Sequence, residues 1–243
     1  MDMGTIVLEP EVIEIEEPDL SHLVTEDDTP VDNIFSEKQQ RLLTESLYSS
    51  WQGPADDGQQ PFIALANVGL FYSVYKTAVV PDVLVSLDVS LPDELWEKKN
   101  RSYFIWEYGK PPEMVIEVVS NRKGGELGHK KELYASLGIG YYVVFDPAHQ
   151  LAERPLHLFE RRQVAYAPLE RPWFPALSLG LTLWEGSYEG QPARWLRWCR
   201  ADGSLILTGA ELAQQERERA EQERGRADRL AAQLRAAGIE PEA

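Results

Sequence analysis

The pattern of apolar and polar residues along the chain predicts a middle part of short strands interrupted by two helices. The clearest strand signal is residues 114–120, which are almost wholly apolar or β-branched. Side chains of this kind favour a buried strand. The same pattern places helices at 37–50 and 126–137, and strands at 62–72, 79–89, 141–146, 156–162, 164–167, 174–183 and 193–200.

Both helices carry end signals in the sequence. Ser36 is a suitable N-cap for the first, and Gln39 three residues later completes a capping box. The second helix ends at Gly138, a residue suited to the left-handed position after a helix. Because strands precede and follow this second helix, residues 114–146 predict a parallel crossover.

A third helix is predicted near the C-terminus. Thr208 and Glu211 form a second capping box, which opens a long polar helix ending at about Ala237. Ala213, Ala220, Ala227 and Leu234 recur every seven residues, but the positions between them are mostly polar. This is a weak heptad pattern. It leaves open both a solvated helix and a coiled coil that pairs with another chain.

Composition narrows the class of protein. With 243 residues and 43% hydrophobic content, the chain is long enough for one sizeable domain with extensions. A single cysteine, Cys199, excludes an internal disulfide framework and fits a reducing compartment. No apolar run is long enough to span a bilayer, and the acidic N-terminus does not resemble a signal peptide. We therefore expect a cytoplasmic protein without a membrane partner.

The charge is distributed unevenly over three regions. The formal net charge is −16, yet residues 1–33 hold 11 acids and no Lys or Arg, while 34–208 hold 21 acids and 18 bases. We expect an acidic arm at 1–33, a main domain at 34–205 and a polar helix at 206–243. The arm either increases solubility or covers a basic groove as a nucleic-acid mimic. The near-neutral middle argues against tight non-specific DNA binding.

Candidate chemistry centres on an acid in the best strand. Glu117 lies within 114–120, and a buried carboxylate is costly unless a cation, a metal or a proton compensates it. Asp82 lies near the start of another apolar strand. Glu126, Lys130 and Tyr134 are spaced i, i+4, i+8, which places them on one helical face. The order is therefore strand with Asp, strand with Glu, helix with Lys.

This order resembles the PD-(D/E)XK nuclease superfamily and, more narrowly, the Uma2 family of restriction-endonuclease-like proteins. The likeness covers roughly residues 34–205 and rests on Pro81-Asp82-Val83, on Pro112 to Ser120, on Lys130 to Tyr134 and on Tyr141 to Pro147. It implies an α/β fold with a restriction-endonuclease-like mixed central sheet and flanking helices. The superfamily's usual lysine position is Val119 here, so the resemblance implies that Lys130 or Lys131 on the next helix replaces it.

The resemblance also implies roles for individual residues. Asp82, Glu117 and the carbonyl of Val118 would hold Mg²⁺ or Mn²⁺, and Lys130 or Lys131 would hold the attacking water. Glu126 would orient that lysine, and Tyr134 would support it. Glu37 either assists near the metal or is simply a favourable charge in the first helical turn.

Nucleic-acid contacts are predicted at two basic segments. Lys98, Lys99 and Arg101 lie among aromatic residues that either stack on bases or pack into the core, and Arg122 and Lys123 form a basic turn. Other chemistries lack support, because the histidines and Cys199 show no zinc spacing. We expect metal-dependent hydrolysis of phosphodiester bonds in nucleic acid, with DNA favoured over RNA.

An alternative from another class stays open. The fold would then be an inactive scaffold that acts as a protein-interaction module through its extensions. A homodimer is compatible with the nuclease hypothesis, because cutting two strands usually needs two sites, but nothing in the sequence requires it.

Overall fold

The computed structural model describes residues 33–55, 60–120 and 125–237. Within these residues a mixed sheet of six strands forms the centre of the molecule, in the order β1-β3-β5-β6-β7-β8. Strands β5 and β6 are parallel, and the other neighbours in this sheet are antiparallel. The strands are β1 (Phe62–Ala66), β3 (Val83–Leu87), β5 (Met114–Val118), β6 (Tyr141–Phe145), β7 (Leu156–Arg162) and β8 (Ala165–Pro168).

The three middle strands β3, β5 and β6 are buried along their whole length. Both faces of these strands are covered, which explains why their sequences are continuous apolar runs rather than alternating ones. The parallel pairing of β5 with β6 confirms the predicted crossover. The predicted helix 126–137 is interrupted: a turn over Glu126–Lys130 is kinked at Gly128, and α3 (Lys131–Ser136) follows it. Gly138 adopts φ +88° beyond the end of α3.

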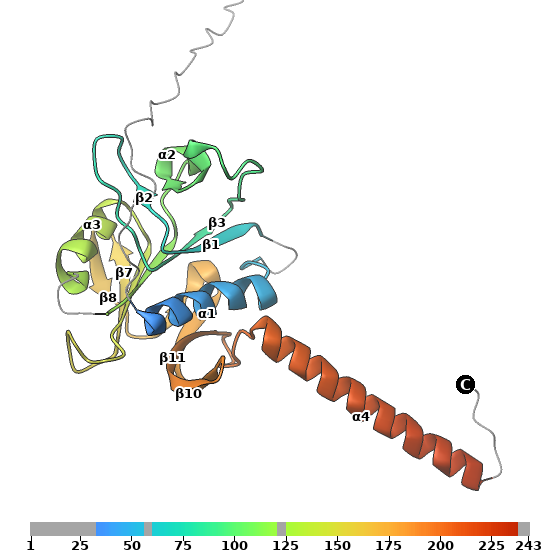
Figure 1. Ribbon diagram of the computed structural model, residues 1–243. Helices are drawn as coiled ribbons and strands as arrows, with labels where there is room; N and C mark the ends of the chain where they lie inside the picture. The colour runs from blue at the N-terminus through green and yellow to red at the C-terminus, as the bar shows by residue number, and fades with distance from the viewer. Residues whose placement is uncertain (1–32, 56–59, 121–124, 238–243) are drawn as a thin grey trace, which may run out of the picture.

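One face of the sheet is covered by α1 (Ile34–Ser50). This helix lies between the central sheet and a second sheet of β9 (Trp173–Phe174), β10 (Leu179–Tyr188) and β11 (Gln191–Cys199) (Figure 1). A short 3-10 turn, Pro175–Leu177, joins β9 to β10. Leu43, Ile116 and Trp198 belong to the apolar core that these layers share.

The opposite face is covered by α3 and by a small parallel sheet. That sheet pairs β2 (Leu70–Phe71) with β4 (Tyr103–Phe104), and α2 (Ile105–Tyr108) follows directly. Tyr103, Tyr134 and Tyr142 belong to the core cluster on this face. Together with the family match reported below, this mixed sheet with helices on both faces confirms the predicted fold class.

Several predicted boundaries were wrong. Helix α1 is capped by Asn33, whose side chain accepts a hydrogen bond from the Ser36 backbone N–H at 2.9 Å. Ser36 is therefore inside the helix. Gln39 does not close a capping box, because its side chain is buried against β11. The predicted strand 62–72 breaks at Asn67, which has φ +56°, and 79–89 forms a regular strand over Val83–Leu87.

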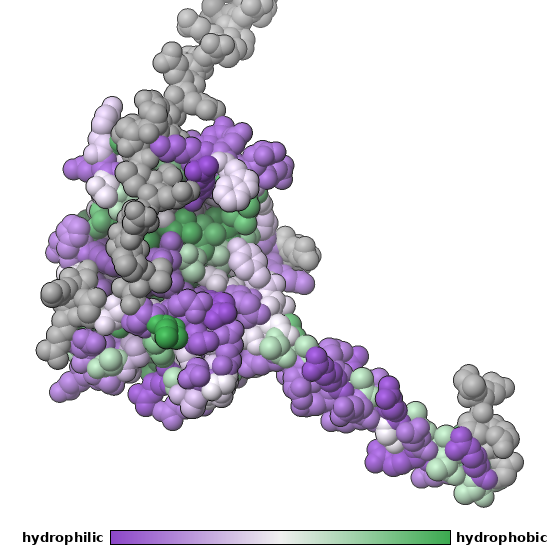
Figure 2. All heavy atoms as spheres, viewed as in Figure 1, coloured by the Kyte–Doolittle hydropathy of each residue, from purple (hydrophilic) through white to green (hydrophobic). Residues whose placement is uncertain are grey.

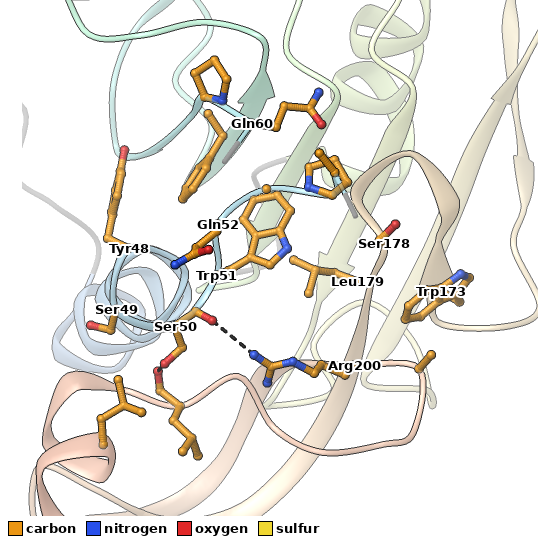
Figure 3. A pocket seen from close by; sticks show the side chains of 18 residues that line it. Tyr48, Ser49, Ser50, Trp51, Gln52, Gln60, Trp173, Ser178, Leu179 and Arg200 are labelled. Carbon is orange, nitrogen blue, oxygen red and sulfur yellow. Dashed lines mark hydrogen bonds between the residues drawn. The ribbon is translucent and has the colours of Figure 1, made fainter. Parts of the chain in front are cut away.

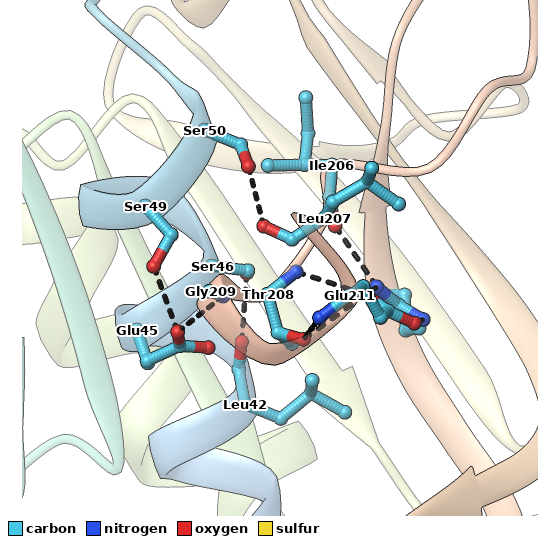
Figure 4. Close-up of polar contacts among 11 residues, drawn as sticks. Leu42, Glu45, Ser46, Ser49, Ser50, Ile206, Leu207, Thr208, Gly209 and Glu211 are labelled. Atoms are coloured by element: carbon cyan, nitrogen blue, oxygen red, sulfur yellow. Dashed lines mark hydrogen bonds and ion pairs between the residues drawn. The ribbon is translucent and has the colours of Figure 1, made fainter. Parts of the chain in front are cut away.

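Helix α4 (Gly209–Ala236) is fixed at its base (Figure 4). Its capping box from Thr208 and Glu211 is present as predicted. The Gly209 N–H donates to Glu45 of α1 at 2.7 Å, and the buried guanidinium of Arg197 donates to both Glu211 carboxylate oxygens at 2.7 and 2.6 Å. These contacts tie the first turn of α4 to α1 and β11.

Beyond its base, α4 projects away from the rest of the molecule (Figure 1). No residue of this helix is buried against other described residues, and its visible surface is predominantly hydrophilic (Figure 2). The described part of the chain contains no helix that is both long enough and apolar enough to cross a membrane.

Candidate active site

The two acids singled out in the sequence lie side by side in the structure. Val83 pairs with Ile116 in the antiparallel ladder of β3 and β5, so Asp82 and Glu117 face each other one position beyond this pair. Asp82 is 8% exposed and Glu117 is 2% exposed. Residues far apart in sequence thus place two carboxylates at one buried point near the end of two strands.

Both oxygens of the Asp82 carboxylate accept hydrogen bonds. The backbone N–H of Val118 donates to Oδ2 at 2.7 Å, and the side-chain amide of Gln40 donates to Oδ1 at 2.6 Å. Val118 belongs to the neighbouring strand, whereas Gln40 comes from α1. The carboxylate plane of Asp82 is therefore fixed at two points that belong to different layers of the fold.

Both oxygens of the Glu117 carboxylate also have partners, and these come from the opposite face of the sheet. The Lys130 ammonium donates to Oε2 at 2.9 Å, and the Tyr134 hydroxyl donates to Oε1 at 2.6 Å. The i, i+4 spacing of Lys130 and Tyr134 lets both reach the same carboxylate. The sequence left Lys130 and Lys131 open as the lysine of the site and expected Tyr134 to support that lysine, whereas the Tyr134 hydroxyl bonds to Glu117 itself.

The segment that carries Lys130 is a turn that is kinked at Gly128, whose φ and ψ are −116° and −109°. The Lys130 N–H donates to the carbonyl of Gly125 at 3.2 Å, and the Tyr142 hydroxyl donates to the carbonyl of Glu126 at 2.9 Å. Tyr142 lies on β6, so the strand next to Glu117 holds this turn in place.

The structure separates the roles of the two neighbouring lysines. The Lys131 ammonium lies 4.0 Å from the centre of the Phe159 ring, a cation–π contact away from the carboxylates. Successive residues of a helix point about 100° apart, so the two lysines face different surroundings. Lys130 is therefore the lysine that reaches the acidic pair.

Burial governs the protonation of this cluster. It raises the pKa of Glu117 to about 8; Lys130 opposes this shift, and the charge of Asp82 adds to it. Burial alone would lower the pKa of Lys130, but the charges of Glu117, Glu126 and Asp82 outweigh it and raise that pKa. Burial therefore favours the protonated form of Glu117, whereas the neighbouring carboxylates favour the charged form of Lys130.

Glu126 acts on the cluster by charge rather than through a hydrogen bond to Lys130. Its side chain is 6% exposed, and its Oε2 atom has no hydrogen-bond partner among the described residues. The charge of Glu126 helps to raise the pKa of Lys130, and the expected orienting role of Glu126 stays a prediction.

Other predicted residues lie elsewhere or outside the described residues. Glu37 is half-exposed and pairs with Arg41 one turn later at 3.1 Å, which fits the simpler of its two interpretations. Lys99 lies 3.8 Å from Glu97, and the Arg101 side chain donates to the carbonyl of Trp96. Lys98 begins the 3-10 turn Lys98–Asn100. Arg122 and Lys123 fall outside the described residues.

The aromatic residues near these cations mostly pack into the core. Tyr103 and Phe104 are fully buried, and Phe104 stacks on Phe71 with ring centres 4.7 Å apart. Trp96, by contrast, is 82% exposed. The core-packing alternative therefore holds for Tyr103 and Phe104, while Trp96 keeps a face free for stacking.

Gln40 and Tyr142 are site residues that sequence reasoning missed. Gln40 is 42 positions from Asp82, and no local spacing links the two. Their contact depends on how α1 lies across the sheet. Tyr142 belongs to a strand with a clear apolar signal, and this signal does not indicate that its buried hydroxyl bonds to the Glu126 carbonyl.

The described residues also form an open cavity that does not include the carboxylates (Figure 3). It measures about 1180 Å³ and lies between the end of α1, the β9–β10 connection and the segment before α4. Trp51, Trp173 and Arg200 line it, and Arg200 donates to the carbonyl of Ser50 at 3.2 Å. Asp82, Glu117 and Lys130 are not among its lining residues.

A comparison with models of protein families places this geometry in context. The model of Uma2, described as "Putative restriction endonuclease", matches residues 26–187. The chain belongs to the Uma2 family. The match contains Gln40, Asp82, Glu117, Lys130 and Tyr134, and it ends before β11 and α4. No curated protein and no solved structure matches the chain. Membership of Uma2 indicates nuclease activity and binding of nucleic acid.

Proposed function

We propose that the protein is a metal-dependent endonuclease that hydrolyses phosphodiester bonds in DNA. The observation that carries this proposal is the convergence of Asp82, Glu117 and Lys130 at one buried point. Two acids and an ammonium group in this arrangement combine oxygen ligands for a hard cation with a positive charge for a phosphate.

The donor set fits Mg²⁺ or Mn²⁺. Each carboxylate oxygen of Asp82 and Glu117 accepts a hydrogen bond from a described residue, and both carboxylates supply the hard oxygen ligands that such ions prefer. The Glu126 side chain adds negative charge near Lys130. The described residues contain no group of three Asp, Glu, His or Cys side chains placed to hold a metal. The proposal therefore relies on two carboxylates, and Mg²⁺ usually takes one or two and keeps several waters.

In this proposal Asp82 and Glu117 hold the ion, and the carbonyl of Val118 is a third ligand. The bound ion would polarise the phosphodiester and lower the pKa of a water molecule. Lys130 holds the attacking water and neutralises the negative charge that develops on the phosphate. The water oxygen bonds to phosphorus and loses a proton, one ester P–O bond breaks, and the leaving oxygen gains a proton, so the products are a phosphate monoester and an alcohol. Tyr134 keeps the Glu117 carboxylate in place.

Plasmid nicking with Mg²⁺ or Mn²⁺ tests the proposal. We expect wild-type protein to nick DNA, and Asp82→Ala and Glu117→Ala each to lower the rate by about a hundredfold or more, the scale seen when a charge-stabilising group is lost. Glu37→Ala is the matched control, because this acid pairs with Arg41 outside the cluster. Unchanged nicking in both site variants would rule out the mechanism.

A second candidate function is an inactive scaffold that binds other proteins. The hydrogen bonds that occupy the carboxylate oxygens, together with the solvent-exposed α4, favour it. This candidate predicts no cleavage of double-stranded DNA, single-stranded DNA or RNA, and no heat of Mn²⁺ binding in calorimetry. Binding of Mn²⁺ that is lost in Asp82→Ala would favour the nuclease instead.

Double-strand cutting by one kind of site requires two copies or two binding events. We propose a homodimer on DNA as the form that cuts both strands. Sedimentation of the protein with and without a short duplex tests this, and a single copy per duplex with full double-strand cutting would contradict it.

A further inference from the structure

Two adjacent glutamines of α1 have different partners. The Gln39 side chain is fully buried, and its amide bonds to both the N–H and the carbonyl of Leu196 on β11, at 2.9 and 2.8 Å. Gln40 is partly exposed, and its amide N–H donates to Asp82 at 2.6 Å. The first glutamine thus fastens the helix, and the second reaches one of the site acids.

The fastening of α1 determines where Gln40 points. The two hydrogen bonds between Gln39 and β11 fix the rotation of α1 about its own axis. The Trp198 indole N–H adds a hydrogen bond to the carbonyl of Leu43 at 2.8 Å. The residue after Gln39 is turned by about 100° around the axis. This rotation directs Gln40 to the strand end where Asp82 lies.

Gln40 holds one of the two oxygens of Asp82. The Val118 N–H donates to Oδ2, and the Gln40 amide donates to Oδ1. Hydrogen bonds to both oxygens restrict the rotation of a carboxylate about its bond to the rest of the side chain more than a bond to one oxygen does. The bond from Gln40 therefore contributes to the orientation of Asp82.

We propose that Gln40 is a positioning residue that orients Asp82 for binding of a divalent cation. This inference rests on the proposed function, because it concerns the same carboxylate. Gln40 does not touch the substrate or the ion in this proposal. It acts through Asp82, and its loss lowers cation affinity without removing a ligand.

The test compares Gln40→Leu with two control variants. Leucine keeps the volume and helix propensity of the side chain but has no donor. Thr44→Val, one turn further along α1, removes a hydroxyl that bonds to backbone carbonyls of α1 itself. Asp82→Ala removes the presumed ligand. Calorimetry with Mn²⁺ gives the affinity, and nicking at increasing Mn²⁺ gives the concentration for half-maximal rate.

We expect Gln40→Leu to weaken Mn²⁺ binding by about tenfold, the scale of one hydrogen bond to a charged group. Its half-maximal Mn²⁺ concentration should rise by a similar factor, and saturating Mn²⁺ should restore its rate. Thr44→Val should behave as wild type. If Gln40→Leu does not fold, Gln40→Asn replaces it, because this shorter amide cannot span the same distance.

Each outcome separates this inference from the proposed function. Wild-type Mn²⁺ affinity in a folded Gln40→Leu protein, or a rate that saturating Mn²⁺ does not restore, would overturn the positioning role. The metal site itself would then still stand if Asp82→Ala loses binding. Wild-type Mn²⁺ binding in Asp82→Ala would instead overturn the proposed function, and the positioning role with it.

Discussion

At the scale of single residues, the site is a balance of buried charges. Glu117 is nearly inaccessible to water, and its pKa is raised because the ionised form loses hydration. The Lys130 ammonium donates a hydrogen bond to one Glu117 oxygen, and the Tyr134 hydroxyl donates to the other. The sequence predicted that this acid needs a partner, because a carboxylate in a β-branched strand is rarely left alone. It did not reveal which of the two lysines takes part.

The raised pKa of Glu117 leads to a pH dependence of stability. The pKa of about 8 in the folded state lies above the ordinary 4.5, so the folded protein binds more protons than the unfolded chain between these values. This contribution to stability is complete below pH 4.5 and is lost as pH rises through 8. In buffer with a chelator, wild type should lose roughly a few kcal/mol more than Glu117→Gln between pH 5 and pH 8.

Urea unfolding of both proteins at the two pH values measures this difference. Added Mn²⁺ should reduce the loss in wild type, because a cation compensates the ionised carboxylate. Equal losses in wild type and Glu117→Gln would show that Glu117 does not titrate in this range.

Replacement of each lysine by alanine should separate their roles. Lys130→Ala removes a donor to Glu117, and we expect nicking to fall by about a hundredfold, comparable to the loss of other charge-stabilising groups. Lys131→Ala removes a contact with Phe159 worth about 0.5–1 kcal/mol and should leave the rate nearly unchanged. Nicking rates and thermal melts of both variants provide the measurement. Similar rates for both would contradict the assignment of Lys130.

At the scale of elements, local signals predicted the crossover from β5 to β6 and the capping box of α4. These depend on neighbouring residues, such as Thr208 with Glu211. The start of α1 was wrong because Asn33 and Ser36 are both good caps and the packing of Gln39 decides between them. The contact between Gln40 and Asp82 depends on the relative placement of two layers, which no periodicity encodes.

The base of α4 offers a test at this scale. Glu211 caps the helix and neutralises Arg197, whose side chain is 2% exposed. Glu211→Ala should therefore destabilise the protein by roughly 3–5 kcal/mol, because it removes the carboxylate that neutralises a buried guanidinium and leaves only its contacts with the Ile206 carbonyl and the Trp184 ring. Thermal melting followed by circular dichroism measures the effect. Glu218→Ala on the exposed part of the same helix is the control and should cause little change.

At the scale of the whole molecule, a layered domain carries a helix that extends into solvent. Ile206 is fully buried in the core, and Thr208 and Glu211 complete the base of α4. Chains that end at 205 and at 213 should therefore behave differently. The shorter chain lacks Ile206 and the partner of Arg197, and we expect it to unfold at a clearly lower temperature. The longer one should melt close to wild type. Equal melting of both would show that the base of α4 contributes nothing to the domain.

The link between Gln39 and Leu196 reaches beyond the part of the chain that the family model matches, which ends at 187. The orientation of Asp82, a proposed metal ligand, thus depends in part on β11, a strand that contributes no residue to the proposed site. Substitutions in the β10–β11 hairpin should therefore change metal affinity without altering any side chain of the proposed site. If residues 26–187 alone were placed in another protein, Asp82 and Glu117 would be present, but the contact between Gln39 and Leu196 that fixes α1 would be absent.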